Sequence, residues 1–121
     1  NILINSANNI AGANTVFGIT TNELNILATA SSTISAVIGT AVAGSLTLSG
    51  TGNVTLSAAN LFTGLTSVNG ATLTYGINDA LSSGGVTVNG GTLALGTAND
   101  TVGAVILQNG RNTCRNILQS S

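Results

Sequence analysis

The chain has 121 residues but no proline, methionine, tryptophan, lysine or histidine, and it has only one cysteine. Charged residues make up 4% of it, against about 25% in an ordinary soluble domain. Without histidine and lysine, histidine-dependent catalysis and Schiff-base chemistry are excluded, and a lone cysteine cannot build a multi-cysteine metal site. Two arginines are too few to hold a phosphate backbone, so nucleic-acid binding is excluded as well.

The residues that are present are small, and many of them are polar. Thr, Ser, Asn and Gly together fill about half of the positions, whereas aromatic residues make up 2%. A hydrophobic fraction of 43% with a net charge of -1 is the opposite of a disordered composition. The apolar residues are mainly Val, Ile, Leu and Ala, which fill narrow and regular interiors. The composition predicts a structural or surface protein.

The chain begins without methionine and without the basic region of a signal peptide, so we expect a segment of a longer precursor. Residues 26–44 carry no charge and have almost the length of a membrane span. Hydroxyl side chains interrupt this stretch, and its β-branched, Gly-bounded character favours strands. We therefore expect no membrane insertion by this segment. The interrupting residues are Thr29, Ser31, Ser32, Thr33, Ser35 and Thr40.

The last residues differ from the rest. Arg111 and Arg115 are the only positive charges, and Cys114 lies between them. We interpret residues 111–121 as an atypical terminal tail or cap that follows a repeat segment at 1–110. The lone thiol is either inert or available for pairing with another chain.

Apolar and polar residues alternate with a period of two throughout the repeat segment. Residues 45–49 read Ser-Leu-Thr-Leu-Ser, residues 53–57 read Asn-Val-Thr-Leu-Ser, and residues 71–75 read Ala-Thr-Leu-Thr-Tyr. Each run is short and bounded by Gly or Asn, which is typical of strands separated by turns. No window has the 3.6-residue apolar spacing of a helix. The pattern predicts an all-β fold.

The strands also recur at a fixed distance. Val-Asn-Gly at 68–70 reappears at 88–90, and Asn-Gly follows at 109–110 with the same spacing. Upstream the interval is slightly longer, and it places Ile2 over Leu24. A period of about 20–22 residues with several short strands predicts a β-solenoid of five to six coils. In that register, Leu73 lies over Leu93 and Val68 lies over Val88, all facing inward.

Asparagine takes a regular place in this frame. Asn69, Asn89 and Asn109 each enter a turn that Gly completes. Stacked side-chain amides can bond to one another along a column, so these three are candidates for a structural ladder. Asn-Gly also suits a turn that needs a positive φ. The two interpretations are compatible.

Residues 50–73 read Gly-Thr-Gly-Asn-Val-Thr-Leu-Ser-Ala-Ala-Asn-Leu-Phe-Thr-Gly-Leu-Thr-Ser-Val-Asn-Gly-Ala-Thr-Leu. This stretch resembles the autotransporter-associated β-strand repeat, which has a Leu-Thr-Leu strand, then Asn-aromatic-Thr-Gly-Gly-Thr, then a Val-Asn-Gly-Gly-Thr-Leu strand. The similarity covers residues 33–96, and the clear motif covers residues 50–76. Ala59 and Leu65 stand where the family often has Gly.

The resemblance implies a right-handed parallel β-helix from the passenger region of a secreted or surface-displayed bacterial protein, associated with the outer membrane. In that family the repeat usually serves as a stalk and secretion scaffold. We therefore expect a non-catalytic segment without a cofactor or metal. The alternatives are a module that binds a carbohydrate or host surface directly and, less favoured, a polysaccharide-active enzyme.

Two carboxylates are candidates for an enzymatic pair. Asp79 and Asp100 are one period apart, so stacking could bring them close enough for a paired-carboxylate hydrolase. Both lie in turn-like sequences, where Asp usually caps its own backbone, and the same two residues could bind calcium only weakly. Glu23 is expected to face solvent. We also expect end-to-end self-association, because a solenoid exposes unpaired strand edges at both ends.

Overall fold

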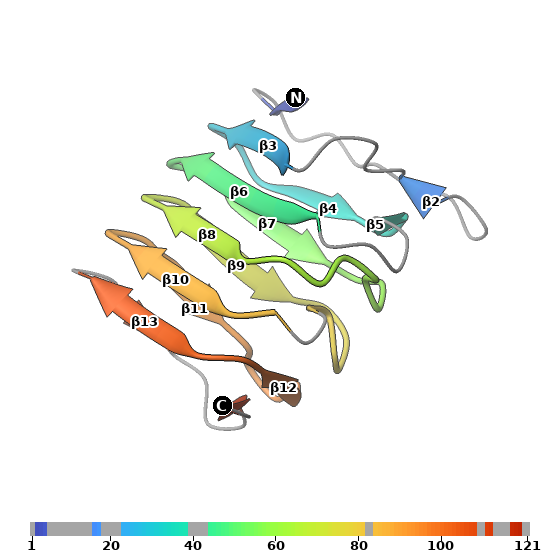
Figure 1. The fold of residues 1–121 in the computed structure, drawn as a ribbon. Helices are drawn as coiled ribbons and strands as arrows, with labels where there is room; N and C mark the ends of the chain where they lie inside the picture. The colour runs from blue at the N-terminus through green and yellow to red at the C-terminus, as the bar shows by residue number, and fades with distance from the viewer. Residues whose placement is uncertain are drawn as a thin grey trace.

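A computed structural model describes residues 2–4, 16–17, 23–38, 44–81, 84–108, 111–112 and 117–119, with side chains over 23–38, 44–81 and 84–108. These residues form an all-β solenoid of about four turns in which parallel strands stack as coils. Figure 1 shows the coils following one another from β3 at one end of the stack to β13 at the other. The expected β-solenoid is therefore confirmed. The expectation of five to six coils counted all 121 residues, and about four turns lie within the described ones.

Every regular element is a strand, and no helix occurs among the described residues. The strands are short, because the chain bends at a corner of the coil after a few residues. They are β1 (Ile2–Ile4), β2 (Val16–Phe17), β3 (Glu23–Ala28), β4 (Ser32–Ile34), β5 (Val37–Ile38), β6 (Ser45–Gly50), β7 (Asn53–Leu56), β8 (Thr66–Asn69), β9 (Thr72–Tyr75), β10 (Val86–Asn89), β11 (Thr92–Ala94), β12 (Asp100–Val102), β13 (Val105–Gln108), β14 (Arg111–Asn112) and β15 (Ile117–Gln119).

The strands stack into two larger sheets. A six-stranded sheet has the order β1-β3-β6-β8-β10-β13, and a five-stranded sheet has the order β14-β11-β9-β7-β4. Two further pairs, β12-β15 and β2-β5, lie apart from them. All of these pairings are parallel. Stacking at about 4.7–4.9 Å per coil lets each coil bury the apolar side chains that its neighbour presents.

The alternation in the sequence places the core. In β6, Leu46 and Leu48 are buried, whereas Ser45 and Thr47 remain half-buried on the outer side. The same pattern occurs in β7 and β9, so aliphatic columns fill the interior and hydroxyl residues cover both large sheets. Each fully buried Leu or Val contributes about 1.5–3 kcal/mol relative to an exposed one.

The predicted register is confirmed in the central coils. Leu73 pairs with Leu93 and Val68 pairs with Val88, and all four side chains are fully buried. Within the uncharged stretch, residues 26–28, 32–34 and 37–38 form strands, as expected. Within the described part of the chain, no helix has the length and apolar character needed to cross a membrane.

The first coil departs from the prediction. Ile2 pairs with Ile26 rather than with Leu24, so this coil is two residues longer than predicted. A shift by an even number of residues keeps the period-two alternation of the sequence in phase. The sequence pattern therefore could not distinguish the two registers.

Strand pairing is present after residue 110, and the interpretation of residues 111–121 as a terminal tail or cap stays a prediction. β14 pairs with β11, with Arg111 beside Thr92, and β15 pairs with β12. The backbone of residues 111–112 and 117–119 therefore belongs to the last coil. Arg115 and Cys114 lie outside the described residues.

Candidate functional site

The outer surface of the five-stranded sheet carries two rows of polar residues in register. One row contains Thr33, Thr55 and Thr74, and a neighbouring row contains Asn53, Thr72 and Thr92. All are half-buried, and the Thr74 hydroxyl donates to Asn53 Oδ1 at 2.7 Å across the rows. These side chains offer hydroxyl and amide groups without charge. Such a surface can form hydrogen bonds with a polar ligand but gives it no ionic attraction.

The six-stranded sheet has a similar outer row of Asn25, Thr47, Ser67 and Thr87. At the start of β3, Glu23 is exposed, as expected, and its Oε1 accepts a hydrogen bond of 2.5 Å from the Thr47 hydroxyl. The carboxylate thus joins the row of its own sheet. Asp79 and Asp100 follow β9 and β11 in later coils, so Glu23 is not placed for paired-carboxylate chemistry with either of them.

Asn69 and Asn89, two members of the predicted ladder, lie in register on adjacent strands with exposed side chains. The glycines that follow them have positive φ, 79° at Gly70 and 71° at Gly90, which confirms the turn interpretation. Backbone bonds join these turns: Gly70 N–H donates to Asn89 O at 3.0 Å. The amide ladder itself stays a prediction.

The third ladder position differs. Asn89 pairs with Gln108, immediately before the predicted partner Asn109, which lies outside the described residues. The cause is a shorter coil between β10 and β13: Val86 pairs with Val105, whereas the preceding coil pairs Thr66 with Val86. The inward face of the strand is preserved, because Val86 pairs with Val105 and Val88 pairs with Leu107.

A different asparagine bridges three coils inside the molecule. Asn60 is 5% exposed, its Oδ1 accepts from Ile38 N–H at 2.7 Å, and its Nδ2 donates to Ala80 O at 2.8 Å. One side-chain amide therefore satisfies a backbone donor of the preceding coil and a backbone acceptor of the following one. Sequence reasoning missed this role. The available signal was its position before Leu61-Phe62, where the similar repeat has Asn followed by an aromatic residue.

The two aspartates do not form a matched pair. Asp79 is exposed with a φ of 56°, whereas Asp100 is 3% exposed. Asp100 Oδ2 accepts from the Tyr75 hydroxyl at 2.5 Å and from Leu81 N–H at 3.2 Å. Its carboxyl is thus engaged in holding two neighbouring segments of the solenoid.

Burial raises the pKa of Asp100 above its ordinary value. Removal from water is the largest cause, and the nearby Asp79 charge adds a little in the same direction. The hydrogen bonds from Tyr75, Leu81 and the Thr101 backbone oppose this by stabilising the ionised form. A raised carboxyl pKa in a cleft can mark an acid-base residue, but buried structural networks produce the same shift.

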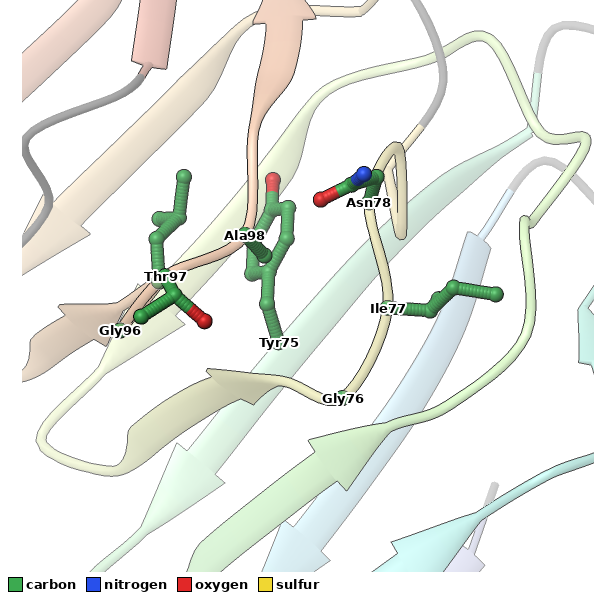
Figure 2. Close-up of a pocket in the computed structure, with 8 residues that line it drawn as sticks. Tyr75, Gly76, Ile77, Asn78, Gly96, Thr97 and Ala98 are labelled. Atoms are coloured by element: carbon green, nitrogen blue, oxygen red, sulfur yellow. The ribbon is translucent and has the colours of Figure 1, made fainter.

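A shallow cavity of about 400 Å³ lies beside this network. Loops of two successive coils form it, and Figure 2 shows Tyr75 standing between them while Ile77 points away. Tyr75 is 6% exposed, so its ring offers little face for a sugar to stack on. Asn78 Oδ1 accepts from Asn99 N–H at 2.9 Å, which ties the loops together. The lining residues are Tyr75, Gly76, Ile77, Asn78, Leu95, Gly96, Thr97 and Ala98.

Metal-binding groups do not gather in the described part of the chain, where no three of His, Cys, Asp and Glu lie together. No protein-family model matches the chain, and no curated protein or solved structure matches it. Function is therefore inferred from the residues described above.

Proposed function

We propose that this chain is a non-catalytic structural segment that acts as a stalk or adhesin scaffold. The observation that carries the proposal is the unbroken parallel register from β3 to β13, in which each coil is covered by the next. Such a stack is a spacer whose length grows by about 4.7–4.9 Å per coil. The buried polar groups of Asn60, Tyr75 and Asp100 support the same role, since their described bonds join coil to coil.

We place this scaffold in the passenger region of a secreted or surface-displayed bacterial protein associated with the outer membrane. The support is the resemblance of residues 50–76 to the autotransporter-associated repeat, together with a surface almost free of charge. Protease treatment of intact cells, followed by immunodetection of the segment, tests this location. Complete protection in intact cells and digestion after lysis would contradict it.

A coil deletion tests the spacer role. Removal of residues 66–85 joins Leu65 to Val86, which occupies the same register position as Thr66. We expect a folded, shorter solenoid, and small-angle scattering should report a loss of about 4.7–4.9 Å in length. The matched control removes residues 66–75, which breaks the register and should unfold the chain. Equal behaviour of the two deletions would contradict a modular spacer.

The second candidate function is direct binding of a carbohydrate or host surface, favoured by the outer rows of Thr and Asn. A glycan array probed with the intact chain distinguishes it from the scaffold role. A scaffold gives no specific signal, whereas direct binding gives one that the Thr72→Ala, Thr92→Ala double variant removes. These substitutions leave the buried columns untouched, because both residues face outward.

A further inference from the structure

The outer faces of the two large sheets differ in how regular they are. The outer rows of the six-stranded sheet include the carboxylate of Glu23 and the exposed apolar side chains of Leu27 and Ile106. The five-stranded sheet instead presents uncharged residues of small and similar size, all of them half-buried. Its register rows are Thr33, Thr55, Thr74 and Ala94, and beside them Asn53, Thr72 and Thr92.

The strand geometry sets two spacings on this face. Neighbouring strands lie about 4.7–4.9 Å apart, so the members of one row repeat at that interval along the stack. The two rows are two residues apart within each strand, which is about 6.6 Å at about 3.3 Å per residue. Figure 1 shows β4, β7 and β9 following one another behind the larger sheet. The outward side chains therefore form a two-dimensional grid.

The grid is held in place by the fold. Threonine is branched at Cβ, so few rotations about its first side-chain bond are allowed in a strand. The Thr74 hydroxyl donates to Asn53 Oδ1 at 2.7 Å, which joins one row to the other. Side chains that are ordered before binding lose little entropy when a ligand arrives.

We propose that this face binds ice. On its prism faces, hexagonal ice repeats its oxygen atoms at intervals close to both spacings of the grid. The hydroxyl and amide groups can donate to and accept from these oxygen atoms, and the threonine methyl groups occupy the space between them. A charged ammonium group would keep its own strongly bound water and disturb such a lattice, and no residue of the two rows is charged.

The extent of the grid is limited. Arg111 follows Thr92 in register on β14, so the uncharged positions are those of β4, β7, β9 and β11. Ice binding does not rest on the scaffold role, because the grid is a property of one outer face and the scaffold role is a property of the stacked core. Failure of either proposal leaves the other standing.

Partitioning of the intact chain between slowly growing ice and the remaining liquid tests the proposal, with both fractions quantified by immunoassay. We expect enrichment in the ice and faceted crystals in the same solution. Thr72→Lys should abolish both, because it places a long charged side chain in the middle of the grid. Thr87→Lys is the matched control on the outer face of the six-stranded sheet, and it should retain both. Circular dichroism and thermal unfolding verify that the variants are folded.

Thr72→Val is a second variant that keeps the branched shape and the strand preference but removes the hydroxyl. It should weaken the enrichment in ice. Two results would overturn the proposal. The first is an intact chain that growing ice excludes at every concentration. The second is enrichment that neither Thr72 variant reduces below that of Thr87→Lys, which would place the contact on another surface.

Discussion

The two large sheets and the third side of the solenoid are built differently. In the sheets, the ladder of the neighbouring strand pairs the backbone, and the interior is aliphatic apart from Ser32, Thr66 and Tyr75. On the third side, between β7 and β8 and between β9 and β10, the described residues form no regular strand. There the interior holds Asn60, and nearby Asp100 supports the same side from the start of β12.

The contrast between the sheets and the third side indicates where a solenoid holds polar groups in its interior. A buried backbone N–H or C=O needs a partner, and a strand ladder supplies one automatically. Where the ladder stops, side chains supply partners that the remaining backbone bonds between coils do not: Asn60 binds Ile38 N–H and Ala80 O, and Asp100 binds Leu81 N–H. Buried polar residues on this side thus complete the backbone pairing between coils.

The largest effect is expected from a charge placed in a sheet column. Leu73 is fully buried between Val54 and Leu93, so Leu73→Asp should cost several kcal/mol and prevent folding. Thr72→Asp places the same group on the outer face and should cost about 1 kcal/mol or less. Denaturant titration measures both. Similar losses would show that the inner and outer faces are wrongly assigned.

The next effect compares the two kinds of asparagine. Asn60→Ala leaves Ile38 N–H without its amide acceptor and removes the amide donor to Ala80 O, so we expect a loss of about 3 kcal/mol. Asn69→Ala changes an exposed side chain and should stay within about 0.5 kcal/mol. Thermal unfolding of both variants checks this. A large cost at Asn69 would contradict the comparison and would instead support the amide ladder.

A smaller effect concerns the pH dependence of stability. Because the pKa of Asp100 is raised in the folded state, the folded chain holds this proton more tightly than the unfolded chain. Stability should therefore fall as the pH rises from the ordinary carboxyl pKa of 3.8 through the folded value, and then level off. The Asp100→Asn variant should lose this decline, measured as unfolding free energy against pH.

Asp79→Asn is the control for this titration. It should keep the decline, displaced slightly toward lower pH, because the Asp79 charge adds to the raised pKa. A wild-type decline that persists unchanged in Asp100→Asn would assign it to another group.

The sequence could predict the sheets because two periods agree there. Alternation assigns inner and outer faces, and the constant interval between repeats stacks Leu73 on Leu93 and Val68 on Val88. It could not predict the shorter coil that puts Gln108 beside Asn89, because the alternation within β10 and β13 is the same at either interval. The number of residues between successive strands has no periodic signal of its own.

The candidate site was harder to predict for the same reason. In the sequence Asn60 is recognisable only as a motif residue, because its role depends on a backbone amide and a carbonyl about one coil away on either side.

The sequence analysis also predicted no role for the glycines at 44, 64 and 84, although they recur at equal spacing. A Cβ on Gly64 would clash with Gly44 O. Glycine is therefore needed at Gly64 because neighbouring backbones approach closely, and not because of a turn.

The smallest predicted effect concerns Ser32, a buried polar residue that lies inside a sheet rather than on the third side. Ser32 occupies an inner position of β4, in register with Val54, and is 6% exposed. Its buried hydroxyl has no hydrogen-bond partner among the described residues, although the strand ladder already serves the backbone there. An unpaired buried hydroxyl costs about 1–3 kcal/mol, so Ser32→Ala should stabilise the chain by about 1 kcal/mol after the small loss of packing.

Ser67→Ala, on the outer face of β8, is the matched control and should change stability by less than about 0.5 kcal/mol. Thermal and denaturant unfolding of the two variants decide the point. A gain at Ser32 confirms that polar groups inside this solenoid stabilise it only where they replace missing strand pairing. A loss there larger than at Ser67 would mean that the Ser32 hydroxyl has a partner in the folded chain, and that the sheet interior also depends on polar contacts.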